Sequence, residues 1–94
     1  MPALLFDVRW PDGKLSRLYS PSTVVHNYFA AGASYPVAEF VTRARTALHA
    51  ASERVRAVHG FPCSRAAATL QQIETQAGRY PPDARVAVER ILHG

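Results

Sequence analysis

The chain has 94 residues, of which 48% are hydrophobic and 19% charged, a composition that excludes a disordered polypeptide and predicts a single small domain spanning residues 1–94. No apolar run approaches the roughly 20 residues of a membrane-spanning helix, and the N-terminus lacks the basic segment of a secretory signal. The single cysteine, Cys63, excludes an intrachain disulfide, so we expect a cytoplasmic protein without membrane contact.

The N-terminal segment predicts a β-hairpin. Residues 4, 6, 8 and 10 are apolar and alternate with Leu5, Asp7 and Arg9, the period of a strand with one buried face. Pro11-Asp12-Gly13 has the residue types of a turn. Residues 14–19 then return as a second strand, in which Leu15, Leu18 and Tyr19 are available for packing.

Three helices are expected next. A short one begins near Ser20-Pro21-Ser22-Thr23, where a serine can cap it, and ends at Gly32. Ser34-Tyr35-Pro36 is expected to open a long helix from about Pro36 to His59, which Gly60 ends. Its apolar residues recur at steps of four and three, the spacing of a helix packed along its length: Val37, Val41, Ala44, Leu48, Ala51, Val55 and Val58.

A third helix is predicted from Ser64 to about Gly78. The short connection favours a long antiparallel αα-hairpin, and alanines on both helices would let the axes approach closely. The long helix exceeds its neighbour by roughly 13 Å. We expect this excess at the beginning of the long helix, covered by the hairpin and short helix or by a second copy of the chain.

The tail from Arg85 to Leu92 suits either a strand or a helix capped by Asp83. The strand is favoured because an isolated two-stranded hairpin is marginally stable and a third strand would complete a small antiparallel sheet. The predicted fold class is therefore α+β.

Few residues have the spacing that catalysis or metal binding requires. His59 and Cys63 are metal-ligand types, but Gly60 and Pro62 break any helical register between them, and a zinc site usually needs four ligands. We expect no metal and no cofactor. Cys63 beside a helix N-terminus could be reactive, but no base or oxyanion site is identifiable, so an enzyme or enzyme subunit using Cys63 is a less favoured alternative.

The net charge of +4 raises the possibility of nucleic-acid binding. Arg43, Arg45, Arg54 and Arg56 flank the apolar stripe of the long helix on both sides, whereas a DNA-reading helix would gather its arginines opposite the core. A small nucleic-acid-binding regulator is therefore an alternative that the arrangement disfavours.

Aromatic residues crowd the first 40 positions, and most are expected to join the sheet to the helices. Any that are exposed would favour protein contact, since Trp and Tyr are enriched at interfaces. The candidate protein interface comprises Trp10, Tyr28, Phe29, Tyr35, Phe40, Arg43 and Arg45.

Several segments together resemble a family of small bacterial nitrogen-starvation response proteins. The matching segments are Val8–Gly13, Tyr19–Val24, Tyr35–Val41, Ala51–Arg56, Gly60-Phe61 and Cys63-Ser64. The resemblance implies a setting in gene clusters that contain a nitrilase and serve nitrile or cyanide assimilation, but it assigns no catalytic residues. The long apolar stripe, the aromatic N-terminal part and the lack of a catalytic constellation favour a non-enzymatic accessory or regulatory protein that contacts a second copy of itself or an enzyme from such a cluster.

Overall fold

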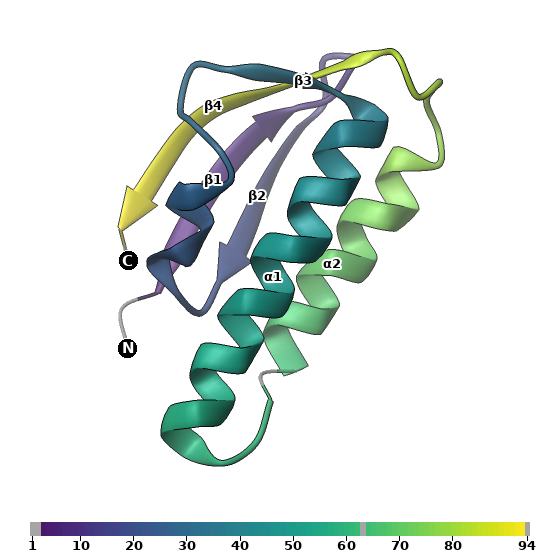
Figure 1. Ribbon diagram of the computed structural model, residues 1–94. Coiled ribbons are helices and arrows are strands. Elements are labelled where there is room, and N and C mark those ends of the chain that lie inside the picture. Colours follow the sequence, from purple (N-terminus) through teal and green to yellow (C-terminus); the bar gives the residue numbers. More distant parts are fainter. Residues whose placement is uncertain (1–2, 63, 94) are drawn as a thin grey trace.

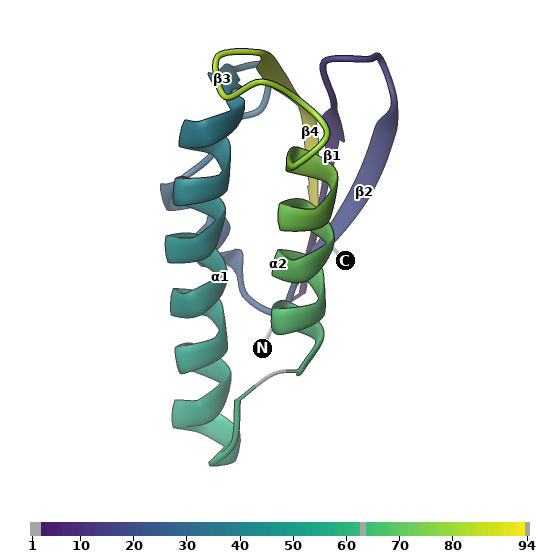
Figure 2. The same cartoon turned by 90° about the vertical axis from the view of Figure 1, so that its right-hand side faces the viewer.

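The chain folds as an α+β structure in which helices cover one face of a four-stranded antiparallel sheet (Figures 1 and 2). The computed structural model describes residues 3–62 and 64–93. The sheet has the order β2-β1-β4-β3. Its elements in chain order are β1 (Leu4–Arg9), β2 (Leu15–Ser20), the 3₁₀ helix η1 (Thr23–Asn27), β3 (Ser34–Pro36), α1 (Val37–His59), α2 (Ser64–Ala77) and β4 (Arg85–His93).

The predicted hairpin is confirmed. β1 and β2 pair in antiparallel register from Leu4 opposite Ser20 to Arg9 opposite Leu15. In the turn, the Gly13 amide donates to the Trp10 carbonyl at 2.8 Å, and Gly13 adopts φ +88°, a conformation that glycine accepts without steric cost. One detail of the prediction is wrong, because Leu15 is 58% exposed and does not pack in the core.

The short helix is confirmed, but it is a 3₁₀ helix that ends at Asn27 rather than near Gly32. The Ser22 hydroxyl accepts a hydrogen bond from the Val24 amide at 3.3 Å, as expected for an N-cap. Only Val24 and Val25 are buried within the element, and Phe29, which was expected on the same helix, is buried beyond its end.

We expected the segment Ser34–Pro36 to open the long helix, but this expectation is wrong, because the segment forms β3. It pairs antiparallel with β4, with Tyr35 opposite Val86. The pairing continues beyond the strand, where the Gly32 amide donates to the Val88 carbonyl at 2.7 Å and the Val88 amide donates to the Ala33 carbonyl at 2.8 Å. The preference of a residue before proline for extended backbone agrees with a strand at Tyr35.

The free backbone amides in the first turn of α1 are hydrogen-bonded to backbone carbonyls and not to a capping side chain. Pro36 occupies the N-cap position and makes no side-chain cap. The Val37 amide instead donates to the Ala84 carbonyl at 2.7 Å, and the Ala38 amide donates to the Pro82 carbonyl at 3.1 Å. The segment leading into β4 therefore supplies acceptors for amides that have no partner within the helix.

The end of α1 was predicted correctly. Gly60 takes a left-handed conformation with φ +84°, and its amide donates to the Arg56 carbonyl at 2.7 Å, as helix C-terminal glycines commonly do. The tail is the predicted strand: β4 lies between β1 and β3 and pairs with both.

The apolar stripe of α1 is buried over only part of its length. Val37, Ala44, Leu48 and Ala51 are buried, Val41 and Val55 are half-buried, and Val58 is 63% exposed. Burial of Val58 was therefore predicted wrongly. The stripe also omitted two core residues of the same helix, Phe40 and Ala47, each 0% exposed.

The extra length of α1 lies at its C-terminal end, not at its beginning as predicted. α1 has 23 residues and α2 has 14, so α1 is longer by about 13 Å. Both cartoon views show α1 projecting beyond the first turn of α2 (Figures 1 and 2). The projecting end carries Val58 and is followed by Phe61, which is 65% exposed.

The core lies between the sheet and the helices. Phe29 is its centre, with ring centroids 5.8 Å from Phe6, 5.6 Å from Tyr35 and 5.0 Å from Phe40. Alanines on both helices are buried: Ala44, Ala47, Ala51, Ala66 and Ala77. The close approach of the two axes that they were expected to allow stays a prediction. No helix in the described part of the chain is both long and apolar enough to cross a bilayer.

Candidate functional site on the open face of the sheet

One face of the sheet has no helix over it (Figure 2). Side chains alternate along β1, so Leu4, Phe6 and Val8 are buried under the helices while the residues between them point the other way. The strand register places their neighbours on β2 and β4. This open face carries Leu5, Asp7, Arg9, Leu15, Arg17, Tyr19, Ala87, Arg90 and Leu92.

A charged row crosses the open face at its middle. Asp7 lies opposite Arg17 on one side and Arg90 on the other. The Arg17 guanidinium donates twice to the Asp7 carboxylate, Nε to Oδ1 at 2.7 Å and Nη2 to Oδ2 at 2.9 Å. Arg90 Nε lies 3.6 Å from Asp7 Oδ2. Two arginines thus share one carboxylate.

The hydrogen bond from Arg17 is the largest influence on the pKa of Asp7 and lowers it; burial opposes this, and the positive charges of Arg17 and then Arg90 add smaller lowering effects, so that the pKa lies below its usual value. The same hydrogen bond raises the pKa of Arg17. Asp7 is therefore held as a carboxylate, which suits an anchor for arginines and does not suit a proton donor.

A β-bulge brings further charge to this region. The register between β1 and β4 shifts at Asp7 and Val8: Asp7 lies opposite Arg90, and Val8 lies opposite Val88. Glu89 is the additional residue on β4, and both Glu89 and Arg90 are exposed. Bulges commonly redirect side chains in this way next to functional sites.

The charged residues surround a shallow depression of about 370 Å³. Arg9 Nη2 lies 3.3 Å from Glu89 Oε1 at its rim. Each carboxylate is thus held by arginine, and the mixed charge suits binding to a polar partner surface better than proton transfer. The lining residues are Asp7, Arg9, Leu15, Ser16, Arg17, Glu89 and Arg90.

Four of the seven residues of the candidate interface lie in the core. Trp10, Phe29, Tyr35 and Phe40 are between 0% and 9% exposed. Trp10 meets Phe40 edge-on at 5.6 Å, and its indole Nε1 donates to Ser16 Oγ at 2.9 Å. In this fold these four aromatic residues join sheet to helices, which is the role expected for most of the aromatic cluster.

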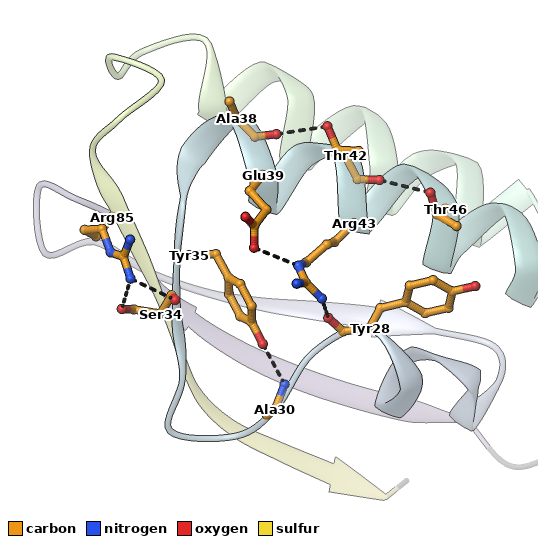
Figure 3. A network of polar contacts seen from close by, with 10 residues as sticks. All are labelled: Tyr28, Ala30, Ser34, Tyr35, Ala38, Glu39, Thr42, Arg43, Thr46 and Arg85. Carbon is orange, nitrogen blue, oxygen red and sulfur yellow. Dashed lines mark hydrogen bonds and ion pairs between the residues drawn. The ribbon is translucent and has the colours of Figure 1, made fainter.

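The other three candidates are Tyr28, which is half-buried, Arg43, also half-buried, and Arg45, which is exposed. Arg43 holds the segment after η1 against α1: its Nη1 donates to the Tyr28 carbonyl at 3.0 Å and its Nε to Glu39 Oε2 at 2.9 Å (Figure 3). The Arg43 guanidinium also lies 4.9 Å from the centre of the Tyr35 ring. Contact with a partner through these three residues stays a prediction.

Arg45 makes a bridge between the two long helices. Its Nε and Nη2 donate to Glu74 Oε2 at 3.0 and 2.6 Å. The pair fixes α1 against α2 at the surface. Both arginines of the candidate interface therefore already have partners within the chain.

Cys63 lies outside the described residues, and so does any pairing of Cys63 with His59. Within residues 3–62 and 64–93, no three or more side chains of His, Cys, Asp or Glu gather as a metal site.

The family described as nitrogen starvation-induced protein NitG matches residues 5–91. The chain belongs to this family. The match to the NitG family includes the whole charged row of Asp7, Arg17 and Arg90, and it makes the chain a small nitrogen-starvation-related protein. Neither curated proteins nor solved structures gave a match.

The sequence interpretation missed the open face of the NitG-family fold as a site. The alternation of Asp7 and Arg9 with buried residues was visible and pointed them away from the core. That Arg90 of β4 belongs to this face could not be predicted from the sequence. The pairing of Arg90 with Asp7 depends on the bulge at Glu89, and hydrophobic periodicity does not reveal a bulge.

Proposed function

We propose that this NitG-family chain is a non-enzymatic accessory or regulatory protein of the nitrogen-starvation response, and that it acts in the cytoplasm by binding another protein through the open face of its sheet. The observation that carries the proposal is a sheet face with no covering layer in the described fold. Leu5, Tyr19 and Leu92 lie together at one end of that face, beside the charged row. At this end the Arg65 guanidinium of α2 lies over the Tyr19 ring, 3.7 Å from its centre, so Leu5, Leu92 and the charged row are the parts that no helix side chain of the described fold is seen to cover.

The surface has the composition of a contact region rather than of a catalytic pocket. Leu15, 58% exposed, adjoins Arg9 and Arg17 in the depression, and arginine beside exposed apolar area is common at protein interfaces. Partners consistent with the family resemblance are a second copy of the chain or an enzyme of a nitrile or cyanide assimilation cluster.

The arginines give less support to nucleic-acid binding. Arg9, Arg17, Arg43, Arg45, Arg56 and Arg90 each lie within 4.0 Å of a carboxylate. Their charge is therefore largely balanced locally, whereas phosphate binding relies on free cations on one face.

The proposal is tested with Leu15→Asp, which places a carboxylate on the open face, and with Val58→Asp as its matched control. Val58 is similarly exposed, at 63%, but lies on the projecting end of α1. Sedimentation of the purified chain measures self-association, and immobilised chain measures binding of purified nitrilase from the same organism.

We expect the wild type and Val58→Asp to bind the same partner, and Leu15→Asp to bind it at least about tenfold more weakly. If both variants bind the partner equally well, the open face is not the contact surface. A wild type that stays monomeric at high concentration and does not bind the enzyme would overturn the accessory function as stated.

A further inference from the structure

Two histidines far apart in sequence meet at the end of the sheet opposite the β1–β2 turn. His26 lies on η1, and His93 is the last residue of β4. Their Nε2 atoms are 3.2 Å apart, although 67 positions separate them in the chain.

The strand register explains the encounter. His93 lies opposite Leu4, and opposite residues of an antiparallel pair point to the same face. Leu4 is fully buried on the helix-covered face, so His93 lies on that face as well. η1 packs against the same face through Val25, which is 0% exposed.

The two rings approach by their nitrogen edges. The ring centroids are 5.0 Å apart with 24° between the planes, while the Nε2 atoms are only 3.2 Å apart. A shorter distance between the nitrogens than between the centres means that the two Nε2 atoms lie on the facing edges. A proton shared between them, or a cation bound by both, would account for this approach.

We propose that Nε2 of His26 and Nε2 of His93 bind one divalent metal ion of the imidazole-preferring class, such as Zn²⁺, Ni²⁺ or Cu²⁺. An ion placed about 2.05 Å from each nitrogen, the usual Zn–N distance, would see the two ligands at an angle of about 100°. That angle fits tetrahedral or octahedral coordination. Neutral imidazole suits these ions, whereas Mg²⁺ and Ca²⁺ prefer oxygen ligands.

Solvent completes the coordination. Among the described residues, no third His, Cys, Asp or Glu side chain joins the pair to make a metal-binding group. The site therefore has open positions, and both histidines are exposed, so the ion exchanges with solution. A bound ion would join the end of β4 to η1. This site lies on the opposite face of the sheet from the proposed protein contact and is independent of it.

The sequence interpretation weighed His59 and Cys63 as ligands, with His26 and His49 as further ligands that only a favourable fold could bring to them, and it did not consider His93. Only the pairing of β4 beside β1 brings His93 back to η1. His49, which is exposed on α1, provides a matched control because it is a surface histidine on another element.

The test uses the full chain without a histidine tag. ZnCl₂ and NiCl₂ are titrated separately into the wild type, His26→Gln, His93→Gln, the double variant and His49→Gln, with heat release as the readout. Two-dimensional amide spectra establish that each variant is folded. Cu²⁺ added to the wild type then broadens the amide signals nearest the bound ion.

The wild type and His49→Gln should each bind one ion per chain. Each single variant at the pair should bind at least about tenfold more weakly, because removing one of two linked ligands removes the chelate advantage. In the wild type, Cu²⁺ should broaden signals around residues 26 and 93 first. Equal affinity in all variants, no binding by the wild type, or broadening centred on His49 or His59 would each overturn the proposal.

Discussion

The first half of α1, residues 37–48, is held against the sheet, η1 and α2, whereas the second half, residues 49–59, ends in the turns that project beyond them. Both halves continue one apolar spacing. Leu48 is 2% exposed in the first half, and Val58 is 63% exposed in the second. The difference shows that helical periodicity identifies the side of a helix that can be buried, while the neighbouring elements decide how far along the helix burial extends.

Leu48→Ala, in the first half of α1, should cause the largest loss of stability. Leu48 is buried in the core cluster, so the truncation removes apolar contacts and leaves a cavity. We expect the free energy of unfolding to fall by about 2–5 kcal/mol, measured by chemical denaturation. A loss below about 0.5 kcal/mol would contradict the distinction between the two halves.

Ala47→Leu tests how closely the first half is packed. Ala47 is 0% exposed, and added methylenes in a filled core cost about 1–3 kcal/mol. Ala57→Leu is the control, because Ala57 is exposed on the projecting half and leucine is a good helix former. Thermal unfolding should show a lower midpoint for Ala47→Leu only; equal midpoints would indicate spare room around Ala47.

Glu74→Gln compares ion pairs in the two regions. Arg45 and Glu74 join α1 to α2 at 2.6 Å, whereas Arg56 and Glu53 lie 3.8 Å apart within α1. Exposed pairs contribute about 0.2–1 kcal/mol, so Glu74→Gln should lower the free energy of unfolding by that amount in low salt. Glu53→Gln should have a smaller effect, and a reversed order would show that the bridge between helices adds no stability.

Val58→Ala should have the smallest effect. The side chain is largely in solvent, and alanine has the higher helix propensity. The change in the free energy of unfolding should lie within about 0.5 kcal/mol of zero, measured under the same conditions as Leu48→Ala. A loss above 1 kcal/mol would mean that the projecting end is covered in solution, as it would be in a self-associated form.

Much of the fold could be predicted because the relevant signals are local. The alternation at residues 4–10, the turn at Gly13 and the end of α1 at Gly60 each depend on residues close together in sequence. β3 could not be predicted in the same way, because three residues show no period, and Ser34–Pro36 is a strand only because β4 pairs with it. The position of the projecting end depends on how α1 and α2 are placed relative to each other, which periodicity within either helix does not specify.

The candidate site was less predictable than the fold. Aromatic residues were predicted both to fill the core and to offer a contact surface, and the structure places Trp10, Phe29, Tyr35 and Phe40 in the first role. The open face depends on the register that brings Arg90 beside Asp7. Registers across distant strands are tertiary properties, and one sequence gives little information about them.

The position of β4 has a consequence for the order of folding. β4 is the last described element along the chain but lies inside the sheet, between β1 and β3. While the polypeptide is being synthesised, residues 3–81 can form local helices and the hairpin, but the backbone groups that β4 will pair with have no protein partner. The sheet can therefore be completed, and the first amides of α1 can find their acceptors, only after residues 82–93 have left the ribosome.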